Sequence, residues 1–387
     1  MLRSLAAIFS LCAAPLAAQT CGGSFSSFTA GLVDEAVSRG HDRATAQQFL
    51  ATARQDQAVL NADRSQGFFQ RDFIDFSRRL ISNNRIENAR ANAQRQDATF
   101  DRIEAEFGIP RGVILAFWAF ETDFGAVQGD FNTLNALVTL AHDCRRPELF
   151  RPQVFAALDL FERGDFNPRT TTGAWAGEIG MVQMLPGDII ENGRDGDGDG
   201  QINLKTSAPD ALLSGASVLA SLGWAPNQPW LQEVSVPNDM DWSLSGTETK
   251  LNAFDWGAMG VSARTGELAN LPASLILPMG RKGPAFLAYP NFDVYFEWNQ
   301  SFVYVLTAAY FGTRLEGASV YNAGNPDAGL SGEQVQALQR KLQDRGYDVG
   351  GADGIIGART RAAIQDEQQR LGLPADAWPT PALLNAL

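Results

Sequence analysis

A strongly apolar run over residues 112–120 leads directly to a carboxylate, Glu121. Ile114, Phe117 and Trp118 precede Glu121 by seven, four and three residues. This spacing places them on the same helix face as Glu121. A carboxylate on such a face leaves water, so burial against aromatic rings is expected to raise its pKa. A glutamate in that setting can hold a proton near neutral pH and deliver it to a leaving oxygen. The alternative is a partly exposed glutamate at a helix end.

The chain has 387 residues, of which 45% are hydrophobic, so it can bury a large core and form two or more domains. Residues 1–19 combine a short basic start, an apolar run and small residues suited to cleavage. This pattern predicts a secretory signal peptide, cut near residue 20, and an exported, periplasmic protein. Beyond it the sequence has no run of about 18 apolar residues that would predict a membrane span.

Two of the three cysteines, Cys21 and Cys144, follow the predicted signal peptide. An even pair in an exported protein predicts a disulfide. The alternative is a lipid anchor on Cys21. It is disfavoured because Ala18 and Thr20 stand where lipoprotein signals usually carry leucine and a small residue.

The charge balance is acidic, with 31 Lys and Arg against 44 Asp and Glu and a net charge of -13. This balance argues against nucleic acid as a partner, because phosphates require a basic face. The sequence holds two histidines, His41 and His142, which excludes a histidine-rich metal centre. An uncharged sugar polymer remains compatible with this composition.

Hydrophobic spacing predicts helices over 24–105, two helices within 131–162 separated near Arg146-Pro147, and a helix over 301–315. The helix that carries Glu121 is expected to open at Ile109-Pro110 and to end at Gly125. Residues 226–290 are dense in Pro, Gly and Trp, which predicts loops and a small sheet.

Three motifs follow one another over about 200 residues. They are Trp118-Ala-Phe-Glu-Thr-Asp-Phe-Gly125, Gly177-Glu-Ile-Gly-Met-Val-Gln-Met-Leu-Pro186, and Gly283-Pro-Ala-Phe-Leu-Ala-Tyr-Pro-Asn-Phe292 with Trp298-Asn-Gln-Ser301. Together and in this order they resemble lytic murein transglycosylases of the membrane-bound B type. The resemblance implies a mainly α fold, with a lysozyme-like helical catalytic domain and a small irregular or β region.

The resemblance also implies cleavage of the bond between N-acetylmuramic acid (MurNAc) and N-acetylglucosamine (GlcNAc) without water. Glu121 would protonate the glycosidic oxygen and then take the proton from the 6-hydroxyl, which closes a 1,6-anhydro ring. One carboxylate suffices because substrate atoms replace both the nucleophile and the water that ordinary glycosidases use. The alternatives are a hydrolytic muramidase and a non-catalytic protein that binds the cell wall.

By the same resemblance, amide and aromatic side chains would bind the glycan. The expected substrate-binding residues are Met181, Gln183, Tyr289, Phe292, Trp298 and Asn299. For the aromatic residues the alternative is ordinary core packing. Relatives often have tyrosine where Trp298 stands, so this chain lacks a phenol at that position.

An acidic loop matches the first half of an EF-hand calcium site. The expected ligands are Asp195, Asp197, Asp199, Gln201 through its backbone carbonyl, and Asp210 as the later closing acid. The B-type relatives have such a loop. Calcium would be structural, because the reaction needs no catalytic cofactor.

The C-terminal unit resembles a peptidoglycan-binding module through Leu338-Gln-Arg-Lys-Leu342 and Asp353-Gly-Ile-Ile-Gly-Ala-Arg-Thr360. A tethered module of this kind raises the local concentration of an enzyme on its polymer. The expected partners are peptidoglycan strands and other cell-wall enzymes, and the expected state is a monomer. The predicted division is signal peptide 1–19, catalytic domain 20–316, linker 317–330 and a small three-helix binding domain 331–387.

Overall fold

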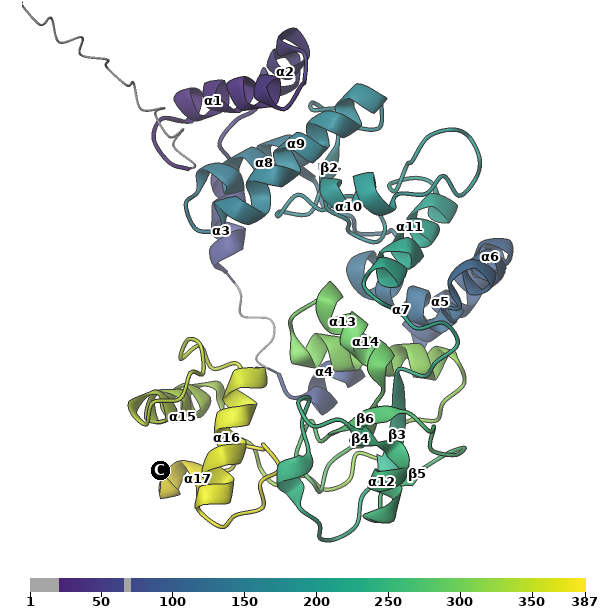
Figure 1. The fold of residues 1–387 in the computed structure, drawn as a ribbon, viewed down its shortest axis with the longest axis vertical. Helices are drawn as coiled ribbons and strands as arrows, with labels where there is room; N and C mark the ends of the chain where they lie inside the picture. The colour runs from purple at the N-terminus through teal and green to yellow at the C-terminus, as the bar shows by residue number, and fades with distance from the viewer. Residues whose placement is uncertain (1–20, 66–70) are drawn as a thin grey trace, which may run out of the picture.

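The computed structural model describes residues 21–65 and 71–387 (Figure 1). The predicted signal peptide lies outside these residues. The described chain is mainly helical with small antiparallel sheets, which confirms the predicted fold class. Among the described helices, none combines the length and apolar character needed to cross a membrane.

Short polar side chains start most of the N-terminal helices. The side chains of Ser24, Asp42, Asp56, Asp72 and Ser82 each accept a hydrogen bond from a first-turn backbone N–H, which satisfies a donor that the helix itself leaves free. The helices are α1 Phe25–Ser38, α2 Arg43–Leu50, α3 Gln57–Arg64, α4 Phe73–Leu80, α5 Asn83–Arg95 and α6 Asp97–Phe107. They bear out the helical spacing over 24–105.

The helix that carries Glu121, α7, runs from Arg111 to Thr122 and is buried along most of its length. It packs against α14, Phe302–Leu315. At Gly112 a Cβ would lie 2.8 Å from the carbonyl oxygen of Gly312, so glycine permits this close crossing. The helix ends at Thr122, three residues before the expected Gly125, because the chain turns left-handed at Asp123 (φ 49°).

A second group of helices forms its own core with α1 and α2. Its members are α8 Thr133–His142, α9 Pro147–Arg163, α10 Pro186–Asn192 and α11 Ala208–Ser221, the last of which also packs on α6 and α7. The break between α8 and α9 falls near Arg146-Pro147, as predicted. Met181, Leu222 and Trp298 pack against both this core and the core around α7 and α14. The two halves of the predicted catalytic domain therefore meet at these side chains.

The Pro- and Gly-rich region does contain a sheet. Its five strands are antiparallel, in the order β4-β6-β7-β3-β5. They are β3 Leu231–Ser235, β4 Leu251–Asn252, β5 Ser262–Ala263, β6 Pro272–Ile276 and β7 Ala285–Ala288, joined by the 3-10 helix Trp242–Leu244 and by α12 Ala253–Ala258. A two-stranded ribbon pairs β1 Phe131–Asn132 with β2 Thr172–Gly173. Helix α13, Pro290–Trp298, leads from the sheet to α14 in the middle of the molecule (Figure 1).

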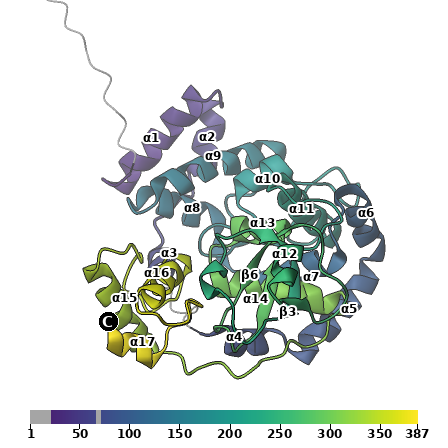
Figure 2. The same cartoon turned by 60° about the horizontal axis from the view of Figure 1, so that its bottom comes forward.

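The C-terminal unit is helical, with α15 Gly332–Asp344, α16 Ala358–Arg370 and α17 Pro381–Ala386 around a small apolar core. Ser331 and Gln334 form a reciprocal capping box that starts α15. The unit lies on the opposite side of the molecule from α5 and α6 in both views (Figures 1 and 2).

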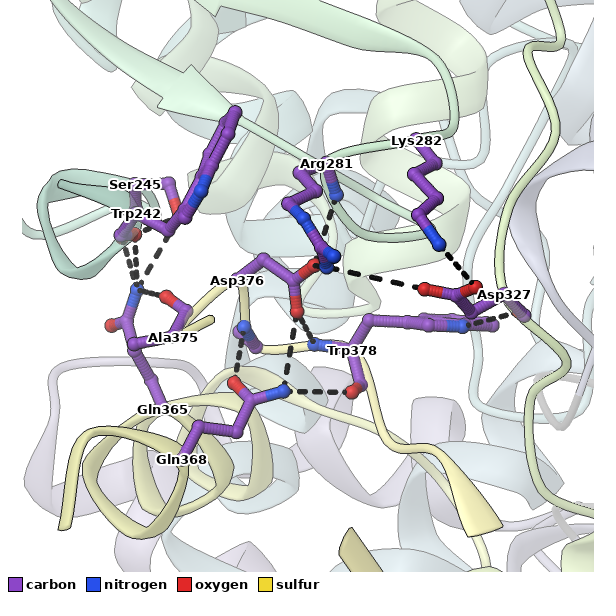
Figure 3. Close-up of polar contacts among 11 residues, drawn as sticks. Trp242, Ser245, Arg281, Lys282, Asp327, Gln365, Gln368, Ala375, Asp376 and Trp378 are labelled. Atoms are coloured by element: carbon purple, nitrogen blue, oxygen red, sulfur yellow. Dashed lines mark hydrogen bonds and ion pairs between the residues drawn. The ribbon is translucent and has the colours of Figure 1, made fainter. Parts of the chain in front are cut away.

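This unit is docked on the catalytic domain through a network centred on Asp376, a buried carboxylate (Figure 3). One oxygen of Asp376 accepts from the backbone N–H and the guanidinium of Arg281, and the other from Gln368 and the backbone of Trp378. Gln365 donates to backbone carbonyls of Trp242 and Ser245. The module is thus held in one orientation, whereas the sequence predicted only a tether.

Candidate functional site

Glu121 lies in the last turn of α7, and its side chain is partly buried. Its Oε1 atom accepts two hydrogen bonds, one from the indole Nε1 of Trp298 at 3.0 Å and one from the hydroxyl of Tyr304. Trp298 ends α13 and Tyr304 lies in the first turn of α14. Three helices therefore fix the position of one carboxyl group.

The protonation of Glu121 follows from these surroundings. Burial raises the pKa of Glu121, the hydrogen bonds from Tyr304 and Trp298 lower it, and the net result is a raised pKa. Both donors use the lone pairs of Oε1, so the proton of the neutral acid belongs on Oε2. Among the described residues no hydrogen bond reaches Oε2. This is the arrangement of an acid that is held by one oxygen and can deliver a proton from the other.

Aromatic packing holds the partner of Glu121 in place. The ring of Trp298 lies 4.6 Å from the ring of Phe117, which in turn stacks on Tyr295 at 4.9 Å. Phe117 precedes Glu121 by one helical turn, so the same face of α7 supplies both the carboxyl group and the support for its donor. The predicted helix face thus builds this side of the site.

The loop between β2 and α10 covers the end of α7. The hydroxyl of Thr122 donates to the carbonyl oxygen of Met181 at 2.6 Å, and the backbone N–H of Gly125 donates to that hydroxyl. A Cβ at Gly125 would meet the Met181 side chain at 3.1 Å. The predicted residue Met181 is therefore next to the end of α7, beside Glu121.

Gln183, expected to offer its amide to the sugar, uses that amide within the protein. Its Nε2 donates to the carbonyl oxygens of Gly180 at 2.8 Å and Gln128 at 3.3 Å. The backbone of Gln183 is left-handed, with φ 55°, and the two hydrogen bonds hold this tight turn. In this structure its donor atoms stabilise the loop over α7, and a direct role of Gln183 in sugar binding stays a prediction.

Tyr289 and Phe292 are core residues, each only 1% exposed. The hydroxyl of Tyr289 donates to Gln232 and accepts from the backbone N–H of Ala269, within the sheet region. Phe292 packs on Tyr295 in the core around α7 and α14. Neither ring has a face open to a sugar, so the prediction of these two as substrate-binding residues is wrong.

Asn299 follows Trp298 directly and lines a pocket of about 830 Å³ at the junction of the catalytic domain and the C-terminal unit. The same pocket is lined by Ser301, by residues 354–357 and by Trp378 of the C-terminal unit. The side-chain oxygen of Asn299 accepts from the backbone N–H of Ser301. The structure therefore joins the Glu121 region to this pocket through two consecutive residues.

Sequence reasoning missed two polar groups near Glu121. Tyr304 supplies a phenol hydroxyl that Trp298 lacks, and it comes from the next helix. Relatives often have tyrosine where Trp298 stands. This replacement was a signal in the sequence, because a tyrosine from another helix could supply the missing hydroxyl donor. Glu178 lies inside the second motif, but the resemblance assigns no role to this position, so the pattern gave no signal for it.

The acidic loop brings three of its four expected carboxylate ligands together. Carboxylate oxygens of Asp195, Asp197 and Asp210 lie within 4.8 Å of one another. Asp210 is only 1% exposed, and its oxygens accept backbone N–H groups of the loop. Asp199 is not among these three residues, and its side chain accepts the backbone N–H of Gln201. Three carboxylates this close repel one another, and a hard cation fits such an oxygen donor set.

Cys21 and Cys144 form a disulfide. It joins the segment before α1 to the turn after α8, where the backbone N–H of Gly22 also donates to the carbonyl oxygen of His142. The link fastens the N-terminal helices to the second core.

Comparisons with family models and known proteins identify relatives of this chain. The family model described as the transglycosylase SLT domain matches residues 24–313, and a model for a peptidoglycan binding domain matches residues 331–387. The chain is 25% identical over 293 residues to membrane-bound lytic murein transglycosylase B of Escherichia coli, which covers 72% of this chain and 80% of that protein.

Solved structures are also similar to this chain. SltB3 from Pseudomonas aeruginosa, in complex with NAG-anhNAM-pentapeptide, is 35% identical with a TM-score of 0.85, over 94% of this chain and 99% of that chain. The Escherichia coli lytic transglycosylase Slt35, in complex with calcium, shares the fold at 24% identity and a TM-score of 0.66, over 77% of this chain and 96% of that chain. The chain therefore belongs to the transglycosylase SLT domain family: it is a lytic transglycosylase with a C-terminal peptidoglycan-binding domain.

Proposed function

We propose that this enzyme cleaves the β-1,4 bond between MurNAc and GlcNAc in peptidoglycan without water and leaves 1,6-anhydro-MurNAc ends. Glu121 is the acid and then the base of this reaction. The observation that carries the proposal is the partly buried carboxyl group with a raised pKa and with both of its hydrogen-bond donors on Oε1. SltB3, the 35% identical relative, has been solved with an anhydro-muropeptide, NAG-anhNAM-pentapeptide.

The proposed reaction conserves the proton. Glu121 gives the proton on Oε2 to the glycosidic oxygen as the bond to C1 breaks, and the acetamido oxygen of MurNAc stabilises the cationic C1. The Glu121 carboxylate then takes the proton of the 6-hydroxyl while O6 bonds to C1. Glu121 ends protonated, as it began. During the ionised interval, Trp298 and Tyr304 stabilise the carboxylate through Oε1.

The substrate surface in this proposal is smaller than the sequence predicted. Trp298, which is hydrogen-bonded to Glu121, Asn299, at the junction of the two domains, and Met181, beside the end of α7, contact the glycan. The C-terminal module binds the same polymer, and export to the periplasm brings the enzyme to it. The match of residues 331–387 to a peptidoglycan binding domain supports this binding role of the module.

The test is cleavage of purified sacculi by the Glu121→Gln variant. Glutamine keeps the shape of the side chain but cannot carry the transferable proton, so we expect cleavage to fall by at least about 10²-fold. Asp123→Asn is the matched control, because Asp123 is two residues away, is exposed and pairs with Arg85. Cleavage that survived in the Glu121→Gln variant would refute the assignment of Glu121, and retained wall binding without cleavage in the wild type would favour a non-catalytic protein.

We also propose that the loop over residues 195–210 binds a structural calcium ion through Asp195, Asp197 and Asp210. The buried carboxylate of Asp210 supports this, because it forms no ion pair with an Arg or Lys among the described residues. Excess calcium is expected to raise the Tm of the wild type, since a ligand that binds the folded state stabilises it. Asp210→Asn should abolish that rise, whereas the exposed Asp239→Asn should keep it. An equal rise in all three proteins would refute the site.

A further inference from the structure

Glu178 lies in the loop between β2 and α10, which covers the C-terminal end of α7. The carbonyl oxygen of Glu178 accepts the backbone N–H of Ala174 at 2.9 Å. A Cβ at Gly173 would lie only 1.9 Å from that oxygen, so the backbone of the loop is folded tightly on itself here. The hydrogen bond from Thr122 to Met181 fixes the same loop to α7. The position of Glu178 relative to Glu121 is therefore held by the backbone.

The side chain of Glu178 has an unusual environment for a carboxyl group. Its Oε2 atom is buried and has no hydrogen-bond partner. Glu178 forms no ion pair among the described residues, and the nearby Arg146 is bound to Asp63. A buried carboxylate oxygen without a hydrogen-bond partner disfavours the ionised form of the group. The structure around Glu178 thus favours the protonated acid.

The charge on Glu121 acts on Glu178. Burial is the main reason that the pKa of Glu178 is raised to about 7. Hydrogen bonds from the backbone of Glu178 and Ala176 and the charge of Arg146 lower this pKa, whereas the negative charge of Glu121 raises it. The elements packed against this pair also bring Lys205, bound to Thr172, and Tyr304, bound to Glu121. Two like charges in one buried site cannot both form without a large cost, so they titrate as a pair.

We propose that Glu178 is the second carboxyl group of this active site, where its charge acts on Glu121 and influences the reaction through Glu121. The inference rests on the proposed function, in which Glu121 is the group that touches the glycosidic oxygen. When Glu178 carries the negative charge, Glu121 keeps its proton to a higher pH. Glu178 is therefore a positioning residue. Its charge influences whether Glu121 is protonated between two catalytic cycles.

The first test is the pH profile of kcat/KM for Glu178→Gln. The neutral amide removes the repulsion between the charges of Glu178 and Glu121, so Glu121 loses its proton at lower pH. The limb of the profile on which activity falls with rising pH should therefore move down by about one pH unit. Glu178→Asp keeps a carboxylate, and its limb should stay near that of the wild type. A residue with a merely structural role would lower the whole curve without moving the limb, and this result in Glu178→Gln would overturn the inference.

The second test does not need the Glu178→Gln variant to fold. Linkage is reciprocal, so removing the charge of Glu121 must lower the pKa of Glu178. An NMR titration of labelled glutamate carboxyl carbons in Glu121→Gln should show the Glu178 signal moving at lower pH than in the wild type, and an unchanged titration would overturn the inference. Cleavage by Glu121→Gln would refute the proposed function itself, so the two failures are distinguishable.

Discussion

At the scale of single residues, the site depends on which oxygen of Glu121 is occupied. Trp298 and Tyr304 both donate to Oε1, so they orient the carboxyl group and leave the proton on Oε2. They also stabilise the ionised form, which moderates the rise in pKa that burial causes. The two donors therefore serve both halves of the proposed proton transfer.

The Tyr304→Phe variant tests this arrangement. Loss of the phenol removes a cause that lowers the pKa of Glu121, so the limb of the pH profile on which activity falls with rising pH should move to higher pH. The rate at the optimum should fall about tenfold, the equivalent of one hydrogen bond of about 1.4 kcal/mol. Tyr310→Phe, further along α14 and away from Glu121, is the control for folding. A profile that moved down, or an unchanged rate, would contradict the role given to Tyr304.

The sequence predicted the face that carries Glu121 but not the donors that complete it. Ile114, Phe117 and Trp118 follow helical spacing, which a sequence displays directly. Tyr304 and Glu178 reach the site through tertiary packing, from a different helix and from a loop. A motif states which residue types recur and says nothing of their exposure, which is why Tyr289 and Phe292 were misassigned as sugar-binding faces.

At the scale of elements, ion pairs fasten the short N-terminal helices to the second core. Asp63, in α3, is only 1% exposed and pairs with Arg145 and Arg146 in the turn between α8 and α9. Burial alone would raise the pKa of Asp63, but the hydrogen bonds and charges of the two arginines outweigh it and hold the pKa below its usual range. This ionised carboxylate thus joins two elements far apart in sequence.

The Asp63→Asn variant should lose about 2 kcal/mol of folding free energy at pH 7, because two cations lose a buried partner. Since the folded-state pKa is depressed, the contribution is complete above the unfolded value of about 4 and disappears as the pH falls through the folded value. Urea unfolding at several pH values measures this, and the difference between variant and wild type should shrink in acid. The half-exposed Asp75→Asn, which also loses two arginine partners, should cost much less, because solvent screens such a surface pair. Equal losses in both variants would contradict this view of Asp63.

Helices were the easiest elements to predict, since spacing and caps are local. The expected break near Arg146-Pro147 is present, whereas the predicted helix end at Gly125 was three residues too late. There the deciding factor was Asp123, which adopts a left-handed backbone and pairs with Arg85 from α5. Aspartate can take that conformation, and a distant partner that favours it leaves no local signal.

At the scale of the whole molecule, the C-terminal module is part of a fixed assembly. Its contacts with the catalytic domain and the linker use side chains that bind backbone atoms, such as Gln365 with Trp242 and Trp378 with Asp327 (Figure 3). Such contacts follow no periodic pattern, so the sequence predicted a module and a linker but not their docking. The pocket lined by Asn299 exists only because the two units meet.

The Asp376→Asn variant should loosen this docking. An amide replaces a buried carboxylate that accepts hydrogen bonds from Arg281, Gln368 and Trp378, which should cost about 1–3 kcal/mol. Small-angle X-ray scattering should show a larger radius of gyration, and cleavage of sacculi should fall several-fold while cleavage of short soluble glycans changes less. Glu333→Gln, at an exposed position of the module, is the control. An unchanged radius together with lost activity would show that docking was not what the substitution affected.

The most direct measurement of the proposed chemistry is the mass of the products formed from sacculi in water enriched in heavy oxygen. If O6 of the sugar attacks C1 after protonation by Glu121, the new MurNAc ends carry no solvent oxygen and are one water molecule lighter than hydrolysed ends. Ends that contain heavy oxygen would show that water attacks C1, and the enzyme would then be a muramidase.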